Sequence, residues 1–321
     1  MNSAIAILTY RRVEALRLML GQVTQHCPGV PVAVFEDCGQ LDDTEAFLLE
    51  NSEFVRRDME LEADVYRRGA VEVFLAHANV GVTGESNKAI KWFLGHQECD
   101  HLCLCNDDLM VTGPFHETYA AAHEKLGVGL LCFTDFDSPQ YAVTVVKVRG
   151  LKVKLMTRMT GIMMSMTRAL VDAIGYYDAD AFDFGQEHCD YTNRARLSGF
   201  IDLNGQPQHC LDVECPHLHH QDIPSSLDDD EKQKFNTAAD AAIQEVGAQY
   251  SVTSRYRPFS TGGWAKTVAG RDGIGTPLRE FPRYGRIKSS RLSGASPLKP
   301  TVRQVVDLGV DSIGPVSDSL G

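Results

Sequence analysis

The chain has 321 residues, enough for one large domain or two modest ones. Its 43% hydrophobic and 23% charged residues form a globular composition, which excludes fibrous and wholly disordered proteins. Its net charge of -12 argues against a body that binds nucleic acid by neutralising phosphates.

The charge is unevenly distributed along the chain. Residues 1–254 carry 20 basic and 38 acidic side chains, a net charge of -18. Residues 255–303 carry 11 basic and 2 acidic side chains, a net charge of +9, and three later acidic residues restore the total of -12. We therefore expect an acidic body with a basic extension.

The sequence predicts a cytoplasmic protein in a reducing environment. The first residues lack a basic region followed by a cleavage-like site, so we expect no secretory signal. No run approaches ~18 apolar residues, so we expect no transmembrane helix. The nine cysteines are odd in number, and Cys103, Cys105 and Cys132 lie in apolar runs typical of buried thiols rather than of a disulfide framework.

Short β-rich runs alternate with helical patterns through the first ~130 residues, which predicts an α/β fold. We expect a mainly parallel central sheet with helices on both faces. The predicted strands are 4–8, 32–35, 54–56 and 101–105, and the predicted helices are 12–23, 44–50, 61–76 and 86–95.

The pattern changes after a further strand at 128–133. Alternating runs at 142–148 and 151–156 predict a hairpin with Arg149 and Gly150 at its turn. Further helices are expected at 167–174, 191–197 and 229–246. From residue 251 onward Gly, Ser, Pro and Arg dominate, which predicts an extended or loosely ordered segment.

An acidic pair, Asp107 and Asp108, follows the hydrophobic strand at 101–105. Ligands of open parallel sheets bind beyond the carboxyl ends of the strands, and carboxylates there can hold a divalent cation that also binds phosphate oxygens. The alternative is a strand that simply ends in an acidic turn.

Glu36 and Asp37 close the second predicted strand in the same way. Such carboxylates recognise a ribose hydroxyl or the edge of a base, but they also cap helices in turns. Gly81 and Asn87 suit a tight loop that opens a helix, or ordinary turn chemistry.

A third group, Glu187, His188 and Asp190, begins the helix that continues through 191–197. A carboxylate or imidazole there could accept a proton from an acceptor hydroxyl. The alternative is a set of acidic residues that favour the positive end of the helix dipole.

The segment 209–220 is rich in histidine and cysteine. It lacks the second ligand cluster of a structural zinc site, so we favour a single histidine that completes an Mg²⁺ or Mn²⁺ site. Packing or surface histidines are the alternative.

In order along the chain, these motifs resemble those of GT-A-fold, family-2-like nucleotide-sugar glycosyltransferases. The family's Thr-Tyr-Asn-Arg-like turn, Asp-Asp-Gly-Ser motif, Asn-x-Gly and DXD metal motif, and its later Gly-Phe-Asp and Gly-Gly-Glu-Asp-x-Asp motifs, have counterparts here. The matching residues are Thr9 to Arg12, Glu36 to Gly39, Asn79, Gly81 and Asn87, Asn106 to Asp108, Gly175 to Asp178, and Gly185 to Asp190.

The resemblance covers roughly residues 4 to 220 and implies a UDP-sugar-dependent, inverting transferase that uses Mn²⁺ or Mg²⁺. Residues 1–130 would form the nucleotide-sugar-binding half and 131–250 the acceptor half of one domain, followed by the extension 251–321. It implies that Asp108, with His217 and His219, holds the metal. The implied donor-binding residues are Thr9, Tyr10, Arg12, Asp37, Asn87, Asn106 and Asp107, and the implied catalytic residues are Glu187, His188 and Asp190.

Two residues depart from the family pattern. His188 stands where the family has its usual catalytic aspartate, so the identity of the base stays open among Glu187, His188 and Asp190. Ala78 replaces a basic residue that often precedes Asn-x-Gly.

The alternatives to a transferase are a non-catalytic nucleotide-sugar-binding module and a nucleotidyltransferase of related fold. The latter usually has a glycine-rich basic loop after the first strand, which is absent from LTYRRVEAL.

The acceptor stays undetermined between a glycan and another hydroxyl compound, including a hydroxylated base in DNA. The basic extension interleaves arginines with aromatic residues such as Tyr256, Phe259 and Trp264. This pattern is compatible with nucleic acid or an anionic membrane. It also suits an extension that is either solvated or docked on the acidic body and offsets its charge, which we favour.

Overall fold

The computed structural model describes residues 1–37, 43–134, 142–156, 161–182, 186–208, 210–221, 233, 237, 256–262 and 305–307. The predicted helix at 229–246 and most of the extension lie outside these residues. Within the described ranges, no helix combines the length and the apolar character needed to cross a membrane.

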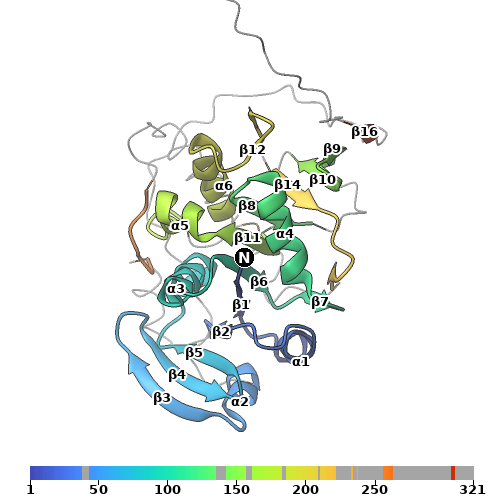
Figure 1. Cartoon of the computed structure of the whole chain (residues 1–321). Helices are drawn as coiled ribbons and strands as arrows, with labels where there is room; N and C mark the ends of the chain where they lie inside the picture. Colours follow the sequence, from blue (N-terminus) through green and yellow to red (C-terminus); the bar gives the residue numbers. More distant parts are fainter. Residues whose placement is uncertain are drawn as a thin grey trace, which may run out of the picture.

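An eight-stranded sheet in the order β3-β4-β5-β2-β1-β6-β11-β8 forms the centre of the molecule (Figure 1). Its strands are β1 (Ser3–Thr9), β2 (Val32–Glu36), β3 (Glu53–Asp58), β4 (Ala63–Arg68), β5 (Val71–Ala76), β6 (His101–Asn106), β8 (Leu130–Phe133) and β11 (Met163–Thr167).

Most strands of this sheet run in one direction. The pairs β5–β2, β2–β1 and β1–β6 are parallel. Strands β4 and β11 are antiparallel to both of their neighbours, so the other six strands share a direction. This confirms the predicted mainly parallel sheet.

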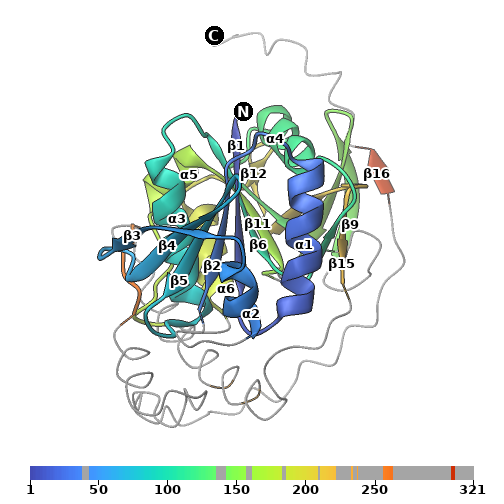
Figure 2. The same cartoon turned by 90° about the horizontal axis from the view of Figure 1, so that it is seen from below.

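Helices cover both faces of the sheet, as predicted. Figures 1 and 2 show α3 and α5 on one side and α1 and α4 on the other. Every residue of β1 and β2 is buried, which matches their nearly continuous apolar sequences. The helices are α1 (Val13–His26), α2 (Asp43–Leu49), α3 (Gly81–Gly95), α4 (Phe115–Leu126), α5 (Arg168–Ile174) and α6 (Glu187–Leu197).

A four-stranded sheet in the order β14-β10-β9-β16 lies beside the main sheet, and two-stranded sheets pair β12 with β13 and β15 with β7. The predicted hairpin is present, with Arg149 at φ 49° and Gly150 at φ 81° in its turn. These strands are β7 (Leu109–Val111), β9 (Ala142–Val148), β10 (Leu151–Met156), β12 (Asp202–Leu203), β13 (Gln206–Pro207), β14 (Cys210–Val213), β15 (Leu218–His220) and β16 (Val305–Asp307).

The helix predicted at 61–76 is wrong, because these residues form the antiparallel strands β4 and β5. Burial along β4 alternates between neighbouring residues: Ala63 and Val65 are buried, and Asp64 and Tyr66 are partly exposed. Gly69 adopts φ 61° in the turn between the strands, a conformation that glycine tolerates. The period of two and the turn glycine outweigh the helical spacing of the apolar residues.

The segment Tyr256–Gly262 of the basic extension packs against the body, beside α3 and α5 (Figure 1, orange). Arg257 exchanges backbone hydrogen bonds with Ile174 and Tyr176, and its Nε lies 2.9 Å from Asp178 Oδ2. The Phe259 ring packs edge-on against Tyr176 at 5.3 Å between centroids. At least this part of the extension therefore docks on an acidic side chain of the body.

Candidate nucleotide-binding and transfer site

The described side chains converge at the carboxyl ends of β1 and β6. Strand β1 lies between β2 and β6 in the sheet. From β1 the chain continues to β2 and β5 on one side, and it then crosses to β6 on the other side of β1. This change of direction makes the boundary between β1 and β6 the switch point at which α/β sheets bind ligands. Thr9 Oγ1 donates a hydrogen bond of 2.6 Å to Asp107 Oδ2 across this boundary.

Arg12, just before α1, contacts both members of the acidic pair. Its guanidinium donates to Asp107 Oδ1 and, at 3.2 Å, to Asp108 Oδ2. Burial raises the pKa of Asp107 to about 6, and Arg12 and Thr9 oppose that rise. Two adjacent carboxylates at a largely buried edge repel each other, and the guanidinium offsets that repulsion.

His220 is the nearest histidine to the acidic pair. Because β15 pairs with β7, His220 lies opposite Leu109, and its Nε2 is 3.8 Å from Asp108 Oδ2. Burial acts to raise the pKa of Asp108, but His220 and Arg12 outweigh it and lower that pKa. The second oxygen of Asp108, Oδ1, is buried and has no hydrogen-bond partner among the described residues.

His217, which precedes β15, and His219, within β15, have other surroundings. The ring of His217 packs on Gly113, where a β-carbon would overlap it. His219 is exposed. Because neighbouring residues of a strand point to opposite faces, His219 and His220 of β15 lie on opposite faces. The structure thus brings His220, rather than the two histidines implied by the resemblance, to Asp108.

The donor groups at this edge fit a divalent cation shared with a phosphate ligand. In the part of the chain that is described, no three carboxylate, imidazole or thiol groups form a complete metal centre. Mg²⁺ and Mn²⁺ sites of phosphate-transfer enzymes commonly use one or two carboxylates and take their remaining ligands from substrate and water. Asp108, with its unpartnered oxygen, and His220 are residues of the required kinds.

Two further predicted donor-binding residues, Asp37 after β2 and Asn87 in α3, are buried and hydrogen-bonded to backbone groups. Asp37 is buried, and its Oδ1 accepts a hydrogen bond of 2.7 Å from the backbone N–H of Val80 at the start of α3. Asn87 is fully buried and bonds the backbone of Tyr177 and of Ser260. Asn87 therefore joins α3 to two distant segments and is not brought to the acidic pair.

Tyr10 and Asn106 flank the switch point and are partly exposed. Tyr10 follows β1, and the Arg11 guanidinium lies 5.1 Å from its ring centroid. The backbone N–H of Asn106 donates to the carbonyl of Ile162 at 2.9 Å, which ties the end of β6 to the chain just before β11. Both residues are thus positioned at the rim of the site.

Glu187 and His188 form a pair at the start of α6, with His188 Nδ1 2.5 Å from Glu187 Oε1. The Glu187 side chain is 4% exposed and that of His188 is 23% exposed. Burial disfavours the charged form of His188, but the Glu187 carboxylate outweighs burial and raises the pKa of the imidazole. The His188 ring packs on Gly161, which adjoins the Ile162 carbonyl bonded to Asn106.

Asp190, the third predicted catalytic residue, is bound within the core. Its Oδ2 accepts a hydrogen bond of 2.8 Å from Arg194 Nε, and both side chains are fully buried. Arg194 also donates to the carbonyls of Ile174 and Tyr176. This ion pair fastens α6 to the end of α5. Asp190 is therefore paired with Arg194 in the core, whereas Glu187 and His188 pair with each other.

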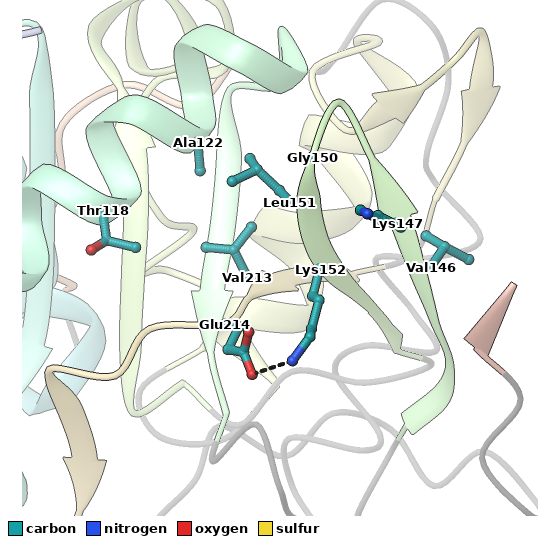
Figure 3. A pocket seen from close by; sticks show the side chains of 9 residues that line it. All are labelled: Thr118, Ala122, Val146, Lys147, Gly150, Leu151, Lys152, Val213 and Glu214. Atoms are coloured by element: carbon teal, nitrogen blue, oxygen red, sulfur yellow. Dashed lines mark hydrogen bonds and ion pairs between the residues drawn. The ribbon is translucent and has the colours of Figure 1, made fainter. Parts of the chain in front are cut away.

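A distinct pocket of about 330 Å³ lies between α4 and the β9–β10 hairpin (Figure 3). Its lining combines apolar side chains such as Leu151 and Val213 with charged ones, and Lys152 Nζ lies 2.8 Å from Glu214 Oε1. None of the predicted site residues lines it. This pocket is therefore separate from the polar cluster at the carboxyl edge of the main sheet.

No family model matches the chain, and no curated protein matches it. Solved structures do, at low identity. They include the mannosyltransferase PcManGT from Pyrobaculum calidifontis with GDP-Man and Mn²⁺ (11% identity, TM-score 0.43, 62% of this chain and 53% of that chain). They also include S. aureus TarS 1–349 with UDP (15%, 0.42, 61% and 55%) and GalNAc-T7 with UDP, GalNAc and Mn²⁺ (11%, 0.46, 76% and 48%).

The chain spans about half the length of these three proteins. Similarity of this extent assigns neither a family nor a substrate to the chain. The class that its own structure defines is an α/β protein with a mostly parallel sheet and a polar, acidic cluster at the switch point.

Proposed function

We propose that the protein is a glycosyltransferase that moves a sugar from a nucleotide-diphosphate sugar, with UDP as the favoured nucleotide, to an acceptor hydroxyl. The observation that carries this proposal is the cluster of Thr9, Arg12, Asp107 and Asp108 at the switch point. The order of sequence motifs that resemble GT-A glycosyltransferases supports the same reaction.

In this proposal Asp108 and His220 would hold the cation, and Thr9, Asp107 and Tyr10 would border the nucleotide. A bound Mg²⁺ or Mn²⁺ would offset the negative charge that develops on the departing diphosphate. Arg12, which pairs with both carboxylates at the same edge, would pair with phosphate oxygens once they enter. Transfer with inversion would need a base on the opposite side of the anomeric carbon from the diphosphate.

The test is nucleotide release from a panel of UDP- and GDP-sugars with Mn²⁺ or Mg²⁺ present. Asp108→Asn keeps the shape of the side chain but removes its charge, so we expect release to fall by about 100-fold or more. Asp100→Asn is the matched control, because Asp100 is exposed and precedes the opposite end of β6. It should leave the rate unchanged.

Two outcomes would count against the proposal. Equal release by wild type and Asp108→Asn would remove the acidic pair from the reaction. Tight nucleotide binding without release from any donor would instead indicate a binding module of the same fold.

A further inference from the structure

We infer that His188 is the general base of the proposed transfer and that Glu187 is its positioning residue. This inference rests on the proposed function and narrows it to one proton acceptor among the three candidates. Three observations support it: the contact between Glu187 and His188, the packing of the His188 ring on Gly161, and the different exposure of the two side chains.

The hydrogen bond between the two side chains decides which ring nitrogen can act. Glu187 Oε1 lies 2.5 Å from Nδ1 of His188, so Nδ1 carries a proton that it donates to the carboxylate. In the neutral ring, Nε2 then has the free electron pair. This is the arrangement in which a carboxylate fixes the tautomer of a catalytic imidazole.

The surroundings of Glu187 distinguish it from a helix-capping residue. It is 3% exposed, and its second oxygen, Oε2, is buried with no hydrogen-bond partner among the described residues. A buried oxygen without a partner costs free energy unless a ligand or water satisfies it. Glu187 is too enclosed to reach an incoming acceptor itself, whereas the partly exposed ring of His188 can.

Gly161 provides the surface on which the His188 ring rests. A β-carbon at this position would lie 2.6 Å from His188 Cε1 and 3.0 Å from Nε2, so any other residue would force the ring to shift. Gly161 also adopts φ 68°, which favours glycine. Through Ile162 this segment is bonded to Asn106, next to the acidic pair, so the imidazole belongs to the same edge of the sheet.

The proton and the electron pairs then move as follows. The acceptor oxygen attacks the anomeric carbon while its proton passes to Nε2 of His188. The bond between the anomeric carbon and the diphosphate oxygen breaks, and its electron pair leaves on the nucleotide diphosphate. Glu187 stabilises the imidazolium that results, and the proton is later lost to solvent through the exposed side of the ring.

The experiment measures nucleotide release with water as acceptor, using UDP-glucose, UDP-GlcNAc and GDP-mannose with Mn²⁺. His188→Ala should lower kcat by 100-fold or more and leave UDP and GDP binding, measured by calorimetry, unchanged. Added imidazole should restore part of the lost kcat, which a purely structural role would not allow. His96→Ala is the matched control, because His96 pairs with Glu98 in the same way near the end of α3.

Glu187→Gln and Gly161→Ala test the positioning of the ring. Both should reduce kcat with little change in KM, and Glu187→Gln should lower the pKa of His188 measured by NMR in the full chain. Glu187→Asp should recover part of the rate. An unchanged pKa of His188 in Glu187→Gln would contradict the pairing, whether or not the chain turns over any donor.

The outcomes separate this inference from the proposed function. If wild type releases nucleotide and His188→Ala releases it equally fast, the base is another group and the transferase proposal stands. If wild type neither binds nor releases any nucleotide, the proposed function fails, and the role of His188 as its base fails with it.

Discussion

Arg12 supplies positive charge to both carboxylates of the candidate site. It contacts both Asp107 and Asp108, and among the described cationic side chains it is the only Lys or Arg paired with them. A guanidinium between two carboxylates reduces their attraction for a metal cation, because it already supplies the positive charge. Binding of a cation and a diphosphate together would let Arg12 turn from the carboxylates to the phosphates.

Replacing Arg12 should therefore strengthen the binding of Mn²⁺ in the absence of nucleotide. We expect Arg12→Gln to bind Mn²⁺ at least about tenfold more tightly than wild type, as measured by electron paramagnetic resonance, because a unit charge a few ångströms away is removed. Arg17→Gln, on the exposed face of α1, is the control. Equal or weaker binding by Arg12→Gln would show that the guanidinium does not compete for this position.

For individual residues, the sequence predicted many members of the candidate site but not which side chains contact one another. Asp107 and Asp108 were recognisable because they follow a buried strand in an α/β chain. The choice of His220 was not, because it depends on the register of β15 against β7, two strands more than 100 residues apart. Nor does the sequence reveal that Asp190 forms a fully buried ion pair with Arg194.

Among the elements, strands β6 and β11 and helix α4 meet at a buried polar network. Ser165 Oγ bonds His101 Nε2 at 2.7 Å and His123 Nε2 at 2.9 Å, and His101 Nδ1 bonds Ser3 Oγ at 2.8 Å. Burial lowers the pKa of His123 to about 4, although the Val128 carbonyl and Ser165 act to raise it. Both imidazoles are therefore neutral in the folded protein at neutral pH.

This network should make the protein sensitive to acid. The unfolded chain binds a proton at His123 below about pH 6.5, while the folded chain does so only below about pH 4. The unfolded state thus binds more protons between these values, so stability falls as the pH decreases through that window. Relative to His123→Gln, wild type should lose roughly 3 kcal/mol of unfolding free energy from pH 6.5 to pH 4.

Urea denaturation of both proteins at several pH values checks this expectation. Subtracting the two curves removes the titration of groups that do not interact with His123, such as the buried Asp212. A difference in unfolding free energy that stayed constant with pH would contradict a depressed pKa at His123.

The elements themselves were predictable to different degrees. Apolar runs located β1, β2, β6 and β8 well, because strands buried on both faces consist almost wholly of apolar residues. The helix expected at 61–76 is wrong because its apolar residues fit both periods, and Gly69 was the signal that favoured a hairpin. Helix α4 was not predicted at all. Its buried face includes His116 and His123, and histidine is a residue type that the sequence pattern does not assign to the core.

In the whole molecule, part of the basic extension contacts the acidic body. Arg257, from the basic extension, pairs with Asp178 of the body, and Asn87 bonds Ser260. These contacts attach the start of the extension to α3 and to the chain that follows α5. The division into a 1–250 domain and a 251–321 extension remains a sequence-based expectation, and residues 256–262 behave structurally as part of the body.

The central claim is that the edge formed by β1 and β6 binds a nucleotide diphosphate with a divalent cation. The most direct measurement is the anomalous difference density of Mn²⁺ in crystals of the full chain soaked with UDP or GDP and Mn²⁺. We expect one strong peak bonded to Asp108 and to the diphosphate, with Thr9 and Asp107 beside the nucleotide. Nucleotide and Mn²⁺ bound elsewhere, with the Arg12 ion pairs intact, would contradict it.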